Sequence, residues 1–324
     1  MDRRTTRRWA LLAAAGVVAA ALAGCSSKSD QPDAASGPVT IEHKFGSTKI
    51  PAKPQRVVTV GWNDQDFVLA LGVTPVSTRA WFDSYNTLPW VKDATGGKGV
   101  TTFSGEINFE AILAQKPDLI LAIYETIDQQ TYDKLTEIAP TVVQSKDYPD
   151  EQTPWDVQTL TIGKALGKQT EAQALVDKVK GKIEEARKAH PEFAGKVLVE
   201  DYGPENGQHY LIPAKDPRRA LFDALGFAAQ SESAELSEER LDVLNRDVLF
   251  VNGATKAIML QSSAFAGLPV VQTDRTLYTT FDTPLAGALS YSGPNALLYA
   301  LDKLVPQLAN AVDGKPETKV ADLN

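Results

Sequence analysis

The sequence has few of the residues that build disulfides and metal sites. Its 324 residues include one cysteine and three histidines. A disulfide within the chain is therefore impossible. His43, His190 and His209 lie far apart without metal-ligand spacing, which disfavours a zinc or manganese site, and we expect them to be ordinary surface residues.

The motifs that mark common catalytic sites are also missing. The chain has no G-x-S-x-G nucleophile elbow, no G-x-G-x-x-G turn and no complete phosphate-binding loop. The stretch from Gly163 to Lys168 is one residue too short for that loop and falls within a predicted helix. We therefore expect a protein without catalytic activity, and a lipid-anchored enzyme remains a distant alternative.

Positive charge is in the minority. The net charge is −8 and the sequence pI is about 5.1. Nucleic-acid-binding domains usually carry a basic patch, so this balance argues against a DNA or RNA partner.

The N-terminus has the pattern of an export signal. Four arginines precede an uncharged stretch, residues 9–24, of mostly Ala, Leu, Val and Gly. This stretch is followed by polar residues before it reaches the roughly 20 apolar residues that a membrane-spanning helix needs. We expect residues 1–24 to be a cleaved signal peptide.

The stretch ends Leu22-Ala23-Gly24-Cys25, which resembles the lipobox of bacterial lipoproteins. The resemblance implies cleavage before Cys25 and lipid on its thiol. The chain would then be anchored at the extracytoplasmic face of the cell membrane, because two acyl chains anchor stably. Thr6-Arg7-Arg8-Trp9-Ala10-Leu11 partly resembles a twin-arginine export signal, but Ala10 stands where that signal has a bulky apolar residue, so Sec export is favoured over twin-arginine export. Residues 25–40 are polar and predict a flexible tether.

The rest of the chain alternates apolar strands with amphipathic helices. Strands are predicted at 56–60, 75–78, 118–123, 141–143, 196–200 and 248–251, and helices at 64–71, 108–115, 129–138, 154–166, 218–225, 239–244 and 295–312. Thr170 is expected to cap a further long helix that ends near residue 189, and Pro306 to interrupt the C-terminal helix. This pattern predicts an α/β fold with parallel sheets, and its length favours two lobes.

Several short motifs together resemble the helical-backbone class of substrate-binding proteins of ABC transporters, in particular the ferric-siderophore-binding members. They are Pro54-Gln55-Arg56-Val57-Val58-Thr59, Gly72-Val73-Thr74-Pro75-Val76, Asn108-Phe109-Glu110-Ala111-Ile112-Leu113, Lys116-Pro117-Asp118-Leu119-Ile120 and Ser292-Gly293-Pro294. The resemblance implies two Rossmann-like lobes, at 41–168 and 191–324, joined by one backbone helix at 169–190. The ligand cleft is expected between the lobes, at the carboxyl ends of the strands.

Aromatic and polar residues just past the predicted strand ends are the ligand-binding candidates. They are Trp62, Asn63, Arg79, Trp81, Tyr124, Tyr202, Tyr210, Asn252 and Arg275. Aromatic rings can lie flat on a large iron chelate, and arginine can donate paired hydrogen bonds to oxygens around the metal. The resemblance implies a ferric siderophore as ligand and no cofactor other than the lipid. Haem, for which Tyr124, Tyr202, His209 and Tyr210 offer possible axial ligands, and cobalamin are the alternatives.

The resemblance also implies partners in the membrane. An ABC permease and its ATPase would receive the ligand from a monomeric binding protein. Acidic residues of related cobalamin-binding proteins dock onto the permease, and the matching positions here are Glu110 and Asp223. Arg218 and Arg219 open a predicted helix, where the helix dipole disfavours cations. Their side chains could therefore contact the ligand or a partner, or be exposed to solvent.

Overall fold

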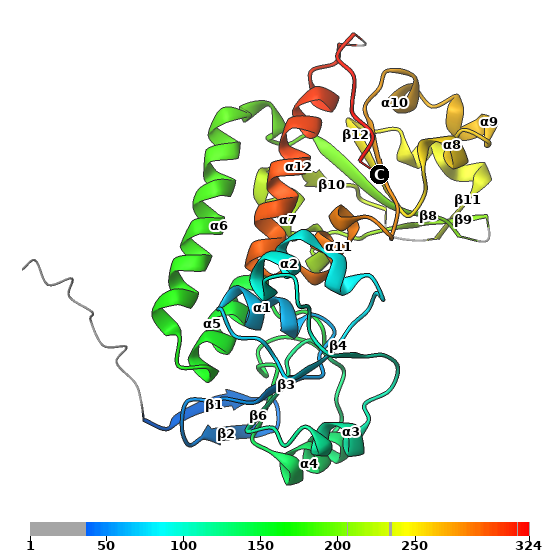
Figure 1. Cartoon of the computed structure of the whole chain (residues 1–324). Helices are drawn as coiled ribbons and strands as arrows, with labels where there is room; N and C mark the ends of the chain where they lie inside the picture. The colour runs from blue at the N-terminus through cyan, green and yellow to red at the C-terminus, as the bar shows by residue number, and fades with distance from the viewer. Residues whose placement is uncertain (1–36, 206, 233–234, 316, 324) are drawn as a thin grey trace, which may run out of the picture. The chain divides into compact units, whose positions relative to one another are not determined.

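The structure, a computed structural model, describes residues 37–205, 207–232, 235–315 and 317–323. The predicted signal peptide, Cys25 and most of the predicted tether lie outside the described residues. The described residues form two α/β lobes joined by α6 (Gln169–Ala189) (Figure 1). None of the helices in these ranges is long and apolar enough to cross a membrane.

The N-terminal lobe is built on a five-stranded parallel sheet in the order β5-β4-β3-β6-β7. Its strands are β3 (Val57–Thr59), β4 (Ser77–Arg79), β5 (Thr102–Phe103), β6 (Leu119–Ala122) and β7 (Thr141–Val143). Its helices are α1 (Asp64–Ala70), α2 (Pro89–Thr95), α3 (Phe109–Ala114) and α4 (Gln129–Ile138). Every residue of β6 is buried, as a parallel strand covered on both faces requires. The predicted alternation of strands and helices is confirmed.

A short antiparallel hairpin, β1 (Val39–His43) and β2 (Gly46–Ile50), precedes this sheet. Ile41 and His43 point inward while Thr40 and Glu42 face solvent, which is the period-two pattern of a half-buried strand. The hairpin was not predicted, and it begins inside the range assigned to the tether. The expectation that all histidines lie at the surface was wrong, since His43 and His209 are buried.

The C-terminal lobe has a six-stranded sheet in which β11-β9-β8-β12-β13 follow in order and β10 pairs with β8. Its strands are β8 (Val197–Glu205), β9 (Gln208–Leu211), β10 (Ala228–Ala229), β11 (Glu235–Ser237), β12 (Val248–Asn252) and β13 (Thr276–Thr279). Strands β8, β10, β12 and β13 are parallel, whereas the β8–β9 and β9–β11 pairs are antiparallel. Strand β13 and the hairpin partner β9 were not predicted.

The helices of this lobe are mostly short. They are α7 (Ala220–Leu225), α8 (Lys256–Met259), α9 (Ser263–Ala266), α10 (Pro269–Gln272), α11 (Pro284–Tyr291) and α12 (Pro294–Val312). Four 3-10 segments complete the fold, at Tyr85–Thr87, Pro191–Phe193, Pro217–Arg219 and Glu238–Leu244. The helix expected at 239–244 is therefore a 3-10 segment. Helix α12 contains Pro306 and continues through it, so the predicted interruption was wrong.

Helix α6 carries one apolar face, as its spacing predicted. Ala172, Val176, Val179, Ile183 and Ala186 are its buried residues, and it packs against α5 (Trp155–Ala165), α7 and α12. The helix begins at Gln169 after Lys168, so Thr170 lies in the first turn and does not cap it. The regular spacing of apolar residues was enough to predict the helix, whereas the prediction that Thr170 caps it was wrong.

The two lobes share one apolar core. A single cluster of buried side chains includes Tyr85 and Trp90 of the N-terminal half together with Phe250 and Tyr291 of the C-terminal half. Between them, Asp66 accepts hydrogen bonds from the Tyr85 hydroxyl at 2.8 Å and the Trp90 indole at 3.0 Å. This shared packing and α6 together connect the two lobes.

Candidate functional site

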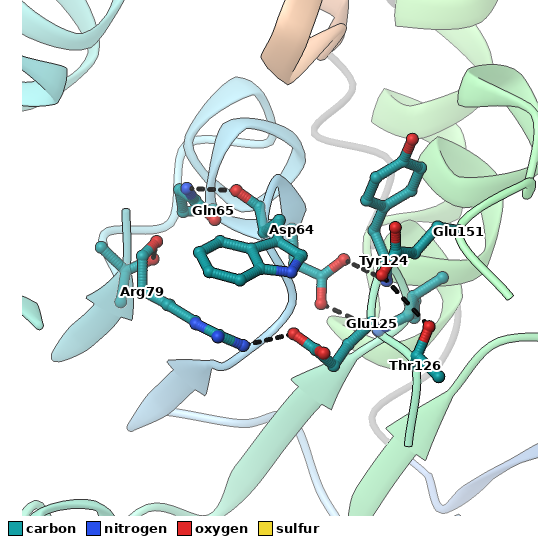
Figure 2. Close-up of polar contacts among 10 residues, drawn as sticks. Asp64, Gln65, Arg79, Tyr124, Glu125, Thr126 and Glu151 are labelled. Carbon is teal, nitrogen blue, oxygen red and sulfur yellow. Dashed lines mark hydrogen bonds and ion pairs between the residues drawn. The ribbon is translucent and has the colours of Figure 1, made fainter. Parts of the chain in front are cut away.

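A buried carboxylate organises the carboxyl edge of the N-terminal sheet. Asp64 Oδ2 accepts from the backbone N–H of Ile123 at 2.9 Å, and Oδ1 accepts from that of Tyr124 at 3.2 Å. Oδ1 also accepts from Gln158 Nε2 at 2.7 Å. Burial raises the pKa of Asp64 to about 6, although these hydrogen bonds act in the opposite direction. Asp64 thus ties the start of α1 to the end of β6 and fixes the backbone of Tyr124 (Figure 2).

Three of the predicted ligand residues form an aromatic cluster at this edge. The rings of Trp62 and Trp81 stack with centroids 5.7 Å apart, and Tyr124 meets Trp81 edge-on at 6.5 Å. Trp81 is 38% exposed. The Tyr291 hydroxyl accepts from the backbone N–H groups of Trp81 and Phe82 at 3.1 and 3.3 Å, and so holds this loop from α11.

Arg79 supports the cluster from within the lobe. Its guanidinium carbon lies 3.4 Å from the centroid of the Trp62 ring, and it forms an ion pair with Glu125 (Figure 2). The two side chains are only 6% and 12% exposed. Burial raises the pKa of Glu125 to about 7, against the lowering effect of Arg79. Arg79 therefore lies behind Trp62 and pairs with Glu125 through Nη1, while its Nε is buried without a partner among the described residues.

The carboxyl edge of the C-terminal sheet presents a second aromatic pair. The Tyr202 and Phe281 rings lie 5.6 Å apart, and the Arg218 guanidinium lies 5.4 Å from the Tyr202 ring. Phe281 is 44% exposed. Gly253 makes room for it, because a Cβ there would lie 3.0 Å from two Phe281 ring carbons.

Behind this pair, three polar groups are buried with atoms that lack a hydrogen-bond partner among the described residues. Both oxygens of Glu200, both amide atoms of Asn252 and Nη2 of Arg219 are in this state. Burial raises the pKa of Glu200 to about 8, although Arg219 and Arg218 act to lower it. The side chains of Glu200 and Asn252, unlike that of Asp64, are not held by a network of hydrogen bonds, whereas Arg219 keeps its contacts with Asp223 and the carbonyl oxygen of Leu198.

A pocket of about 260 Å³ lies between the lobes beside the aromatic cluster. Asn63, Tyr124 and Trp155 line it from the N-terminal half, and Asp216 and Arg218 from the C-terminal half. Burial and the nearby carboxylates Glu151 and Asp216 raise the pKa of Tyr124 to about 12. Tyr124 therefore joins the pocket to the Trp62–Trp81 stack.

Of the remaining predicted ligand residues, Tyr210 reaches this region and Arg275 does not. Tyr210 lies on β9 directly opposite Tyr202, so the two side chains share one face of the hairpin. Arg275 directly precedes β13 and donates to the carbonyl oxygens of Arg246 and Asp247 at 3.0 Å. Arg275 therefore lies at the amino edge of the sheet. The prediction had placed it after a strand because β13 was not recognised from the sequence.

Two residues of the site were missed. Phe281 follows β13, and recognising that strand would have selected Phe281 instead of Arg275 by the same rule. Glu125 was passed over beside Tyr124, since the sequence does not show that it pairs with Arg79.

The other predicted functional residues lie apart from the aromatic clusters. His209, considered as a haem ligand, is 1% exposed, and its Nδ1 lies 2.7 Å from Asp201 Oδ2. Glu110 is exposed in the first turn of α3, whereas Asp223 accepts from Arg219 Nε at 3.2 Å and lines the interlobe pocket.

Known proteins with similar sequences and structures are solute-binding proteins. The ferric-anguibactin-binding protein FatB of Vibrio anguillarum is 28% identical over 273 residues, which cover 78% of this chain and 79% of FatB. A periplasmic solute binding protein from Mycobacterium smegmatis has a TM-score of 0.79 and 32% identity, covering 85% of this chain and 99% of that one. PiaA of Streptococcus pneumoniae in complex with ferrichrome has a TM-score of 0.71 and 26% identity, covering 86% and 99%.

A family model agrees with these likenesses. The model of the periplasmic binding proteins matches residues 57–283, a range that holds both sheets and the helix between them. The chain belongs to the periplasmic binding protein family.

Proposed function

We propose that this protein captures a ferric siderophore between its lobes and delivers it to an ABC permease for iron uptake. The observation that carries the proposal is the pair of aromatic surfaces, Trp62–Trp81–Tyr124 and Tyr202–Phe281, at the carboxyl edges of the two sheets. Open α/β sheets bind their ligands at this edge, and flat rings suit a large chelate. The ferric-anguibactin-binding protein FatB and PiaA in complex with ferrichrome support the same ligand class.

Quenching of tryptophan fluorescence tests this proposal. Trp62 and Trp81 lie in the expected contact surface, so a bound ferric complex should quench their emission saturably at micromolar concentration. The titration should use a panel of ferric siderophores with haemin and cobalamin as competitors. No quenching by any ferric complex would contradict the proposal, and a Soret shift with haemin alone would favour haem as the ligand instead.

Haem receives less support from the geometry. Among the residues considered as its axial ligands, His209 is enclosed and already bonded to Asp201. Tyr124 and Tyr202 remain at the site, but burial raises the pKa of Tyr124 to about 12 and raises that of Tyr202 still further. Both phenols therefore resist the deprotonation that a tyrosine ligand of iron needs.

The docking surface that we propose for the permease centres on Glu110. This carboxylate lines a shallow hollow with Glu106, Glu137, Lys134 and Leu113, and the side chain of Leu113 is 58% exposed. An exposed apolar residue within a rim of three carboxylates and one lysine suits a basic partner surface. Glu110→Arg should therefore reduce iron uptake without changing ligand affinity, whereas Glu184→Arg on α6 should change neither. Unchanged uptake by Glu110→Arg would contradict the assignment.

Anchoring through lipid on Cys25 is the remaining part of the proposal. It rests on the charged and apolar segments that precede Leu22-Ala23-Gly24-Cys25. Cys25→Ser should release the protein from the membrane fraction, and retention of the variant in that fraction would contradict lipid anchoring.

A further inference from the structure

The cations around the proposed ligand site are already engaged by carboxylates of the same chain. Arg79 pairs with Glu125 beneath the Trp62 ring, and both members of this pair are largely buried. A buried pair of this kind keeps its charges neutralised, because either member alone would be an uncompensated charge in a poorly solvated place.

The C-terminal lobe repeats this arrangement. Arg218 forms a two-pronged contact with Asp216, with Nε 2.9 Å from Oδ1 and Nη2 2.7 Å from Oδ2. Its neighbour Arg219 is fully buried, bonds to Asp223 and donates Nη1 to the carbonyl oxygen of Leu198 at 3.1 Å. The hydrogen-bonding edges of both guanidinium groups are therefore directed at the protein itself.

The charges that remain at the site do not alter this balance. Lys215 is exposed at the rim of the interlobe pocket, and Glu151 is partly exposed beside Tyr124 and accepts from Thr126 Oγ1 at 3.2 Å. Arg79, Lys215 and Arg218 are thus matched by Glu125, Glu151 and Asp216. Asp282, exposed directly after Phe281, adds a further negative charge.

Two other arginines do not change this outcome. Arg275 lies at the amino edge of its sheet, and Arg240 is exposed within the 3-10 segment Glu238–Leu244. A strongly anionic ligand would therefore meet paired arginines and the carboxylates that hold them. A nearly neutral ligand would meet aromatic walls and no excess charge.

We propose that this site selects ferric complexes of low net charge, such as those of hydroxamate siderophores, over the strongly anionic complexes of catecholates. This inference rests on the proposed function and specifies its ligand class. Iron bound by hydroxamates is close to neutral because the donors balance the metal, whereas catecholates leave a large negative charge. Specificity then comes from unfavourable electrostatics as much as from contact.

Parallel titrations of the full chain, purified in detergent, test the inference. Ferrichrome and ferrioxamine E serve as neutral hydroxamate probes, and ferric enterobactin as the anionic catecholate probe, with tryptophan fluorescence as the readout. We expect the better hydroxamate to bind at least about tenfold more tightly than ferric enterobactin, and with little dependence on ionic strength. Equal or tighter binding of ferric enterobactin would overturn the inference and leave the proposed function intact. Failure of every probe would overturn both.

Charge-neutralising variants test the cause. Glu125→Gln should raise the ratio of the affinity for ferric enterobactin to the affinity for ferrichrome about tenfold, because it removes one negative charge and frees Arg79. Glu151→Gln, at a more exposed position, should act in the same direction by about threefold and provides the test if Glu125→Gln does not fold. Glu184→Gln on α6 is the matched control and should change neither affinity. An unchanged affinity ratio in both cleft variants would overturn the electrostatic explanation.

Discussion

The two lobes carry similar aromatic surfaces on very different supports. In the N-terminal lobe, the fully buried Asp64 is held by Ile123, Tyr124 and Gln158. In the C-terminal lobe, the carboxylate of the fully buried Glu200 and the side-chain amide of Asn252 make no hydrogen bond within the described residues. Burial raises the pKa of both carboxyls, to about 6 and about 8.

This difference indicates that the two halves of the site differ in how far their hydrogen bonds are formed before a ligand binds. Buried polar groups without partners are costly, so the C-terminal half gains more from a rearrangement that satisfies them. In the N-terminal half, Asp64 already has its hydrogen bonds, so we expect the edge that it holds to bind as a preformed wall. Breaking the N-terminal support should therefore have a larger effect than changing the C-terminal surface.

Removal of the N-terminal anchor should have the largest effect. Asp64→Ala leaves the N–H groups of Ile123 and Tyr124 buried without an acceptor, and each such loss costs about 1–3 kcal/mol. We expect the free energy of unfolding, measured in urea, to fall by about 3 kcal/mol. Asp128→Ala, which removes an exposed helix cap on α4, is the control and should cost about 1 kcal/mol. Equal losses in the two variants would show that Asp64 has no special role.

Loss of an N-terminal ring should come next. Trp62→Ala removes the stack with Trp81 and uncovers Arg79, and a buried aromatic contact with a large ligand is worth about 1–2 kcal/mol. The affinity for ferrichrome, measured by calorimetry, should fall about tenfold. Trp90→Phe, a change in the shared core, should leave the affinity nearly unchanged. An undiminished affinity in Trp62→Ala would remove this residue from the site.

A change in the C-terminal surface should be milder. Gly253→Ala places a Cβ about 3.0 Å from the Phe281 ring and keeps a backbone with φ of +130°. Displacement of Phe281 should weaken ferrichrome binding about threefold to fivefold in the same calorimetric assay. Gly46→Ala, at the start of β2, has a similar backbone penalty, with φ of +119° and no atom within 4 Å, and should leave binding unchanged. Matching effects in the two variants would contradict a ligand role for Phe281.

The smallest expected effect is a dependence on pH. Burial raises the pKa of Glu125 to about 7, so below this pH the group is mostly neutral and no longer competes for Arg79. Ferric enterobactin should therefore bind about threefold more tightly near pH 6 than near pH 8. Glu125→Gln should abolish this difference, and a variant that keeps the wild-type pH profile would assign the titration to another group.

The sequence predicted the fold better than it predicted the site. Strong local patterns placed elements such as α4 and β7 at their observed bounds, and the chain has the expected two-lobed α/β architecture. Strand β13 was missed, because its Thr-Leu-Tyr-Thr segment is short and its burial comes from neighbouring elements. Because of that omission, Arg275, at the amino edge of the sheet, was chosen as a ligand candidate, and Phe281, which follows the strand, was not.

Contacts between residues that lie far apart in the sequence could not be predicted from the sequence at all. Arg79 and Glu125 are separated by 46 positions, and Trp81 meets Tyr291 across 210. Such contacts depend on how the carboxyl edges are brought together by the sheets. For this reason the sequence identified arginines as ligand donors, whereas the structure shows that carboxylates already engage Arg79, Arg218 and Arg219.

Anomalous scattering from a crystal of the ferrichrome complex would locate the iron and so test whether the ligand binds between the two aromatic surfaces. Binding there predicts one iron peak between the two carboxyl edges, with Trp62 and Tyr124 on one side and Tyr202 and Phe281 on the other. An iron peak elsewhere, such as in the hollow beside His209 and Ser262, would contradict it.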